Sequence, residues 1–219
     1  MKTIDNDNKI TTNTFFGTLV MEVQLDFDLE KLTELTFQLQ NKDKQGIQAS
    51  NINGWQSNDI AEEKHEEFIK LKEEMAHYVN LYHSKAFQGM VFEKNVSQSI
   101  ANMWVNNNGK HQYNDWHVHP SATLSGAYYI KHDGVENGNI EFKNPNFPQT
   151  QLQAHWGIGS SYNLNIIKTS NAMTAGIVSI TPKPNQLLIF PAWLEHRVKP
   201  NLNDNSRISL SFNSIIIVK

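Results

Sequence analysis

Residues 186–218 read QLLIFPAWLEHRVKPNLNDNSRISLSFNSIIIV, and they contain two β-forming segments, 186–191 and 207–218, separated by a turn-rich stretch. Short apolar runs bounded by Pro, Asn and Gly are typical of strands. Four similar segments precede them: SIANMWVNN (99–107), TLSGAYYIK (123–131), NIEFK (139–143) and AGIVSITP (175–182). No amphipathic helix lies between these segments. They therefore predict an antiparallel sandwich or barrel of the jelly-roll kind.

The first third of the chain has a helical pattern. We expect a short helix over residues 29–42 and a longer one over about 59–87, with a capping box of Asp59 and Glu62 at the start of the longer one. Apolar residues recur at helical spacing in the longer segment, at Phe68, Leu71, Met75, Tyr78, Val79 and Tyr82. We interpret this stripe as core packing.

The two patterns together predict an α+β chain that is mainly β. Its core is a double-stranded β-helix of the jelly-roll or cupin-like kind, with N-terminal helices packed on one sheet. The 219 residues are enough for one domain. We expect residues 1–92 to supply an N-terminal strand and support helices, and residues 93–219 to form the core.

Composition limits the possible functions. The chain has no cysteine, so any metal must be held by histidine, carboxylate or water, a donor set that favours iron, manganese, copper or zinc. A formal charge of -3 without a basic block gives no sign of nucleic-acid binding. No apolar run approaches the ~20 residues of a membrane span. We therefore expect a cytoplasmic protein that binds a small molecule or a peptide. The sequence is compatible with a homodimer as well as with a monomer.

A pair of histidines forms the first candidate site, in NDWHVHP (114–120). Residues two apart in an extended segment point to the same side, so His117 and His119 can reach one point, as two ligands of one metal must. By itself this pattern is weak, because a chain with nine histidines often contains one by chance.

Three later residues strengthen the metal-site hypothesis. His196 follows the apolar segment 186–191 and is the remote third ligand that a facial metal site needs. Arg207 lies inside an apolar strand, where a charge is costly unless it meets an anion. Ser209, two residues on, presents a hydroxyl on the same face. Arg207 and Ser209 together would hold a carboxylate.

The order HxH, His, RxS on a double-stranded β-helix resembles the iron(II) and 2-oxoglutarate-dependent oxygenases, and more narrowly the 2OG-Fe(II) oxygenase family found in bacteria and phages. The most specific shared stretches are MWVNNNGKHQYNDWHVHPSATLSGAYYIK (103–131) and LLIFPAWLEHRVKPNLNDNSRISLSFN (187–213). NTFFGTLV (13–20), NINGWQSNDI (51–60) and NGNIEFKNP (137–145) support them. The resemblance covers nearly the whole chain.

This resemblance implies Fe(II), 2-oxoglutarate and O₂ as cofactor and cosubstrates. The implied reaction couples oxidative decarboxylation of 2-oxoglutarate to succinate with hydroxylation of an unknown substrate. The implied location is the cytoplasm, or the host cytoplasm if a phage encodes the chain.

The resemblance also implies roles for individual residues. His117 and His196 would be imidazole ligands of Fe(II), and Arg207 would pair with the distal carboxylate of 2-oxoglutarate, assisted by Ser209. Tyr128 or Tyr129 would hydrogen-bond the same cosubstrate. Strand alternation allows only one of the two tyrosines to face inward, and we favour Tyr129.

His119 departs from the pattern of the wider superfamily, which places Asp or Glu at this position. We expect a site of three histidines, His117, His119 and His196, or of two histidines and water if His119 turns away. Neutral imidazoles leave iron its full +2 charge, which a bound 2-oxoglutarate dianion balances. Asp115 and Glu195 lie at odd offsets from their neighbouring histidines, and we expect both to face solvent or to lie behind the ligands.

Other interpretations remain open from the sequence. A cupin with a three-histidine iron site would carry out dioxygenation without 2-oxoglutarate, but it has no need of Arg207 and places a glutamate after its HxH. A zinc or manganese hydrolase or isomerase would likewise not require a buried Arg-x-Ser. A binding or structural jelly roll without turnover would keep the histidines as core polar groups. Residues 144–163 are a candidate lid, although a surface loop is as good an interpretation.

Overall fold

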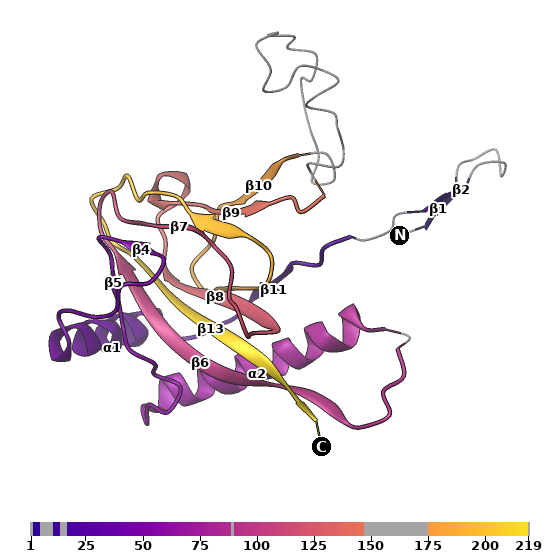
Figure 1. Cartoon of the computed structure of the whole chain (residues 1–219). Coiled ribbons are helices and arrows are strands. Elements are labelled where there is room, and N and C mark those ends of the chain that lie inside the picture. Colours follow the sequence, from indigo (N-terminus) through magenta and orange to yellow (C-terminus); the bar gives the residue numbers. More distant parts are fainter. Residues whose placement is uncertain (1, 5–10, 14–16, 89, 147–174, 219) are drawn as a thin grey trace, which may run out of the picture.

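The computed structural model describes residues 2–4, 11–13, 17–88, 90–146 and 175–218 (Figure 1). The elements in chain order are β1 (Lys2–Ile4), β2 (Thr11–Asn13), β3 (Met21–Gln24), α1 (Leu29–Lys42), β4 (Asn51–Ile52), β5 (Trp55–Gln56), α2 (Glu66–Ala86), β6 (Val96–Asn108), β7 (Tyr113–His117), β8 (Leu124–Lys131), η1 (Val135–Asn137), β9 (Ile140–Lys143), β10 (Ile177–Ile180), β11 (Gln186–Pro191), β12 (His196–Val198) and β13 (Arg207–Val218).

Two antiparallel sheets form the body of the protein. One sheet has the strand order β3-β11-β8-β13-β6-β5, and the other has the order β10-β9-β12-β7-β4. A cluster of apolar side chains from both sheets fills the space between them: Ala127, Tyr129, Ile140, Phe142, Leu188, Phe190 and Leu194. The sheets therefore face each other as a sandwich.

Helices α1 and α2 pack against the outer face of the six-stranded sheet (Figure 1). Strand β8 is consequently buried on both faces. Tyr128 and Ile130 point toward the helices, whereas Ala127 and Tyr129 point between the sheets. Alternation along a strand sends successive side chains to opposite sides, which produces this division.

The mainly β fold with N-terminal helices on one sheet is confirmed. All six segments predicted as strands are strands, and α1 spans the predicted residues 29–42. Asp28 caps α1 by accepting a hydrogen bond from the backbone N–H of Lys31 at 3.0 Å. In the described part of the chain, neither helix is long and apolar enough to cross a membrane.

The predicted start of the longer helix is wrong. Helix α2 begins at Glu66, and its N-cap residue His65 makes no side-chain cap. The Asp59 carboxylate instead accepts hydrogen bonds from the backbone N–H groups of Ala61, at 2.9 Å, and of Met103, at 3.0 Å. Asp59 therefore joins the segment before α2 to strand β6, and no capping box with Glu62 forms.

The N-terminal part contributes more to the sheets than one strand. Strands β3, β4 and β5 all precede residue 92, and they join both sheets. The division of the chain at residues 92 and 93 stays a prediction. The candidate lid at 144–163 falls, from residue 147 on, outside the described residues.

Candidate metal centre

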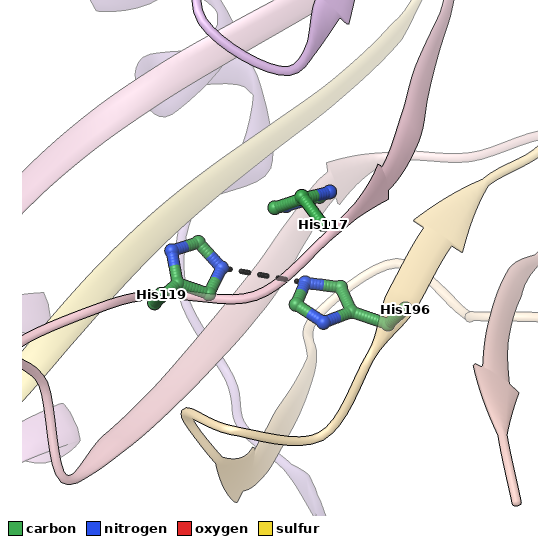
Figure 2. A group of neighbouring side chains, drawn as sticks. All are labelled: His117, His119 and His196. Carbon is green, nitrogen blue, oxygen red and sulfur yellow. Dashed lines mark hydrogen bonds between the residues drawn. The ribbon is translucent and has the colours of Figure 1, made fainter.

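Strands β7 and β12 bring three histidines to one point. His117 ends β7 and pairs across the ladder with His196, the first residue of β12. His119 lies in the loop after β7, where its backbone N–H donates to the carbonyl oxygen of Ala192 at 2.9 Å. The candidate ligand nitrogens of the three histidines all lie within 4.8 Å of one another. Figure 2 shows the three rings converging.

Backbone carbonyls orient two of the rings. The Nδ1 atom of His196 lies 2.8 Å from the carbonyl oxygen of Leu194, and Nδ1 of His117 lies 2.6 Å from that of Asp115. A carbonyl oxygen can only accept, so each Nδ1 carries the proton and each Nε2 keeps a free lone pair. The Nε2 atoms of His119 and His196 are 3.3 Å apart, as the dashed line in Figure 2 marks.

The environment keeps these histidines neutral. Burial, together with the neighbouring His117, lowers the pKa of His196 to about 3 and that of His119 to about 4. Burial also lowers the pKa of His117. All three rings therefore carry no charge at neutral pH, and their lone pairs are available to a metal cation.

Arg207 is a buried cation that lines the same cavity as the three histidines. Its side chain is 1% exposed. Its Nη1 donates to the carbonyl oxygens of Asn137 at 3.1 Å, Gly138 at 3.3 Å and Lys199 at 3.2 Å. Burial lowers the pKa of Arg207 to about 10, and within the described residues no carboxylate pairs with it. A buried charge without a counter-ion favours the binding of an anion.

Ser209 and Tyr129 lie beside this cation. They face each other across the ladder between β13 and β8, and both line the cavity with the three histidines and Arg207. Tyr128 points the other way, and its hydroxyl donates to the side-chain oxygen of Asn185. Of the two candidate tyrosines, only Tyr129 therefore reaches the cavity, which is the one that the sequence analysis favoured.

Neither nearby carboxylate reaches the histidines. Glu195 pairs with Lys143 at 2.9 Å on the surface. The Asp115 carboxylate accepts a hydrogen bond from the backbone N–H of Trp116 at 2.8 Å. Both carboxylates point away from the ligand nitrogens, as their odd offsets from His117 and His196 predicted. The candidate metal ligands in the described chain are therefore imidazoles.

Several polar or aromatic residues line this cavity although their sequence pattern predicted no role for them. Strand β6 contributes Trp104 and Asn106, and β13 contributes Ser211. The amide nitrogen of Asn106 donates to the hydroxyl of Ser211 at 3.1 Å. Alternation along β6, which puts Trp104 and Asn106 on one face, was the available signal, but it does not reveal which face is the inner one.

Comparison with known families agrees with this geometry. The family described as "Putative 2OG-Fe(II) oxygenase" matches residues 102–213, from β6 to β13. The chain belongs to this family. Its members, and therefore this oxygenase, use non-haem Fe(II) and 2-oxoglutarate. No curated protein sequence matches the chain.

Solved structures share the fold of this oxygenase at low identity. The carbocyclase SnoK from nogalamycin biosynthesis, described as non-haem and α-ketoglutarate-dependent, has a TM-score of 0.60, is 9% identical, and aligns over 90% of this chain and 79% of its own. HygX from Streptomyces hygroscopicus, with nickel and 2-oxoglutarate bound, has a TM-score of 0.56 at 11% identity, over 90% of this chain and 82% of its own.

A prolyl-4-hydroxylase from Pseudomonas putida also shares the fold. Its TM-score is 0.54 at 11% identity, and the alignment covers 90% of this chain and 92% of its own. At such identities the similarity establishes the jelly-roll fold and no residue roles.

Proposed function

We propose that this oxygenase binds Fe(II) through His117, His119 and His196, and 2-oxoglutarate through Arg207, Ser209 and Tyr129, and that it hydroxylates a small-molecule or peptide substrate. The cytoplasm, where 2-oxoglutarate is available, is the proposed location. The observation that carries the proposal is the pairing of three neutral, convergent imidazoles with a buried, unpaired arginine in one cavity.

The three imidazoles fit Fe(II) by charge as well as by geometry. Imidazole is a suitable ligand for Fe(II), and a facial arrangement of three ligands leaves positions open on the metal. Uncharged ligands leave the ion its +2 charge. A dianionic cosubstrate then balances that charge, whereas a carboxylate at position 119 would make the complex net negative.

Arg207 and its neighbours fit the distal carboxylate of 2-oxoglutarate. The guanidinium donates in a fixed fork that matches a carboxylate. Tyr129 is 1% exposed and Ser209 is 8% exposed, so water competes little with their hydroxyls. Burial raises the pKa of Tyr129, which keeps its hydroxyl protonated as a donor. The anion would supply the counter-charge that the described residues do not offer to Arg207.

When bound together, Fe(II) and 2-oxoglutarate supply the oxidising power for substrate hydroxylation, with succinate and CO₂ as coproducts. The chain's own residues have other tasks. The carbonyl oxygens of Leu194 and Asp115 hold the His196 and His117 rings in the ligating tautomer. Phe190 packs edge-on against His196, with 4.6 Å between ring centroids, and excludes water from that side.

Anaerobic visible absorption spectroscopy on metal-free protein tests this proposal. Fe(II) and then 2-oxoglutarate are added to the wild type, Arg207→Ala, Ser209→Ala and His119→Ala. A charge-transfer band that requires both additions is expected in the wild type. Loss of one partner of a buried charge pair costs ~2–5 kcal/mol, so Arg207→Ala should weaken 2-oxoglutarate binding at least about 30-fold.

Arg197→Ala is the matched control for the arginine variant. Arg197 lies on β12 and pairs with Glu141 at 2.7 Å on the outer side of the sheet, so its loss should leave the band unchanged. Iron binding without any effect of 2-oxoglutarate would favour the cupin-type dioxygenase. Absence of iron binding in the wild type would contradict the proposal and favour a jelly roll without turnover.

A further inference from the structure

A serine from the N-terminal part of the chain lies against the three histidines. Ser50 directly precedes β4, and its Oγ is 3.5 Å from Nε2 of His117. This Nε2 is the nitrogen that His117 would offer to a metal. Ser50 also lies outside residues 102–213, the segment that matches the oxygenase family. The family match therefore assigns no role to Ser50.

The backbone around Ser50 is tied to the strand that carries His117. Strands β4 and β7 pair with Asn51 opposite Asn114. The carbonyl oxygen of Ser50 accepts a hydrogen bond from the backbone N–H of Asp115 at 2.9 Å. The buried side chain of Asn51 holds the preceding loop through hydrogen bonds to its backbone. The Ser50 hydroxyl is consequently held beside the His117 ring by the same strand pairing.

Two neighbours fix the direction of the Ser50 hydroxyl. The amide nitrogen of Asn114 can only donate, and it donates to Oγ of Ser50 at 3.2 Å. The Nε2 atom of His117 carries no proton, because its Nδ1 donates to the carbonyl oxygen of Asp115. The hydroxyl therefore accepts a hydrogen bond from Asn114 and directs its own proton toward the lone pair that a metal would use.

A metal on His117 would take this lone pair, and the Ser50 proton would then need another acceptor. Ser50 lies where the inner cavity meets an outer groove, and it lines both, as do Trp104, His117 and His119. Arg207, by contrast, lines the inner cavity and not this groove. Three imidazoles leave positions open on a metal. A further ligand of the metal on the groove side would therefore be the acceptor nearest to Ser50.

We propose that Ser50 is a positioning residue of the metal centre. Its hydroxyl, oriented by Asn114, donates a hydrogen bond to a ligand that the metal holds on the groove side. The inference rests on the proposed function, because it requires a metal at the three histidines. It adds a residue from the N-terminal segment to a site whose other members lie in the segment that matches the family.

A cysteine at position 50 tests whether this side chain reaches the metal. The chain has no cysteine, so Ser50→Cys introduces a single thiol, and a thiolate binds divalent transition metals. Co(II) added anaerobically to Ser50→Cys should give an intense thiolate-to-cobalt absorption band that the wild type lacks. Ser84→Cys is the matched control. Ser84 is exposed on α2, outside the six-stranded sheet, and its variant should give no band.

Nitric oxide measures the hydrogen bond itself, because it binds at an open position of Fe(II) and can accept a hydrogen bond. Its affinity for the Fe(II)- and 2-oxoglutarate-loaded protein is followed by electron paramagnetic resonance. This affinity should fall about threefold to tenfold in Ser50→Ala, and Ser50→Thr, which keeps the hydroxyl, should restore it. Asn114→Leu should also lower the affinity, but it should add no further loss to Ser50→Ala.

Ser57→Ala separates this role from a structural one. Ser57 also lines the groove, but its Oγ donates to the carbonyl oxygen of Asn58 at 2.7 Å and accepts from the backbone N–H of Val105 at 2.9 Å. Loss of this hydroxyl should lower the free energy of unfolding and leave the affinity for nitric oxide unchanged.

The two proposals fail in distinguishable ways. Binding of Co(II) and of 2-oxoglutarate is first measured in the wild type, and the absence of either would contradict the proposed function. If both bind, the inference is overturned by either of two results while the proposed function stands. One is a Ser50→Cys variant without a thiolate band, and the other is a Ser50→Ala variant with the wild-type affinity for nitric oxide.

Discussion

The Nε2 atoms of His119 and His196 face each other at 3.3 Å, although 77 positions separate the two residues in the chain. The Nε2 atom of His196 carries no proton, because its Nδ1 donates to the carbonyl oxygen of Leu194, so in the metal-free protein the Nε2 of His119 donates this hydrogen bond. A metal cation would take the place of this proton between the two nitrogens. Because only the folded chain brings the rings together, metal binding should stabilise the folded protein.

Substitution of His119 tests whether it is a third ligand. His119→Ala should weaken metal binding at least about 100-fold, because the loss of a ligand exceeds the ~10–100-fold effect of losing an outer partner. His119→Asp should retain binding, since a carboxylate also ligates Fe(II). Competition with a chelator measures both affinities. His77→Ala, at an exposed position on α2, is the control, and an unchanged affinity in His119→Ala would remove His119 from the site.

The stability of the metal-free protein should fall as the pH falls from about 6.5 toward 4. In the unfolded chain, histidines bind protons near pH 6.5. In the folded protein, burial delays protonation to a pKa of about 4 for His119 and about 3 for His196. The unfolded state therefore binds more protons throughout this window, and acid favours unfolding.

Urea unfolding at pH 7 and pH 5 measures this effect. A double variant, His119→Gln with His196→Gln, removes both groups and should flatten the dependence in this window, while other titrating groups stay the same. An equally steep loss of stability in the double variant would show that other residues cause the acid sensitivity.

The two adjacent tyrosines should have separable roles. Tyr129→Phe should weaken 2-oxoglutarate binding about tenfold by removing one hydroxyl from the cavity, with little effect on stability. Tyr128→Phe removes the donor to Asn185 on the helix side, so it should lower stability and leave 2-oxoglutarate affinity unchanged. Calorimetric titration and thermal unfolding measure the two effects. The reverse assignment of effects would mean that β8 presents Tyr128 to the cosubstrate.

Gly138 should be required for the position of Arg207. Its φ of +91° is a region that residues with a Cβ rarely adopt, and an added Cβ would overlap Nη1 of Arg207 and the carbonyl oxygen of Lys199. Gly138→Ala should therefore cost more than the ~1–3 kcal/mol of backbone strain alone, and it should also weaken 2-oxoglutarate binding.

Gly134 provides the matched control, because its φ is +90° and nothing lies within 4 Å of an added Cβ. Gly134→Ala should show the strain without the loss of 2-oxoglutarate affinity. Equal effects of the two variants on affinity would indicate that Arg207 tolerates the displacement.

Much of the fold was predictable because its signals are local. Apolar runs bounded by turn residues located the six predicted strands, and the spacing of Leu32, Leu35 and Leu39 located α1. The start of α2 was not predictable in this way. Asp59 resembles a cap in sequence, but its oxygen meets the backbone of Met103, a strand residue 44 positions later.

In the candidate site, too, some features follow from the local sequence and others depend on the tertiary structure. The order HxH, His and RxS is a property of the sequence, and the residue types alone indicated a metal and an anion. The choice between Tyr128 and Tyr129 needed the parity of β8 relative to the helices, and a shift of one residue would exchange them. The position of Asn106 in the cavity needed the same knowledge, because Asn106 and Asn107 have identical side chains on opposite faces of β6.

The sequence by itself determined six of the strands, the short helix and the residue types of the site, since these follow from local periodicity and side-chain chemistry. Only the tertiary structure decided that the three histidine rings meet at one point, that no described carboxylate pairs with Arg207, and that Asp59 bonds to the backbone of Met103. Each of these depends on atoms from segments far apart in the chain, and packing between two sheets and two helices sets their distances.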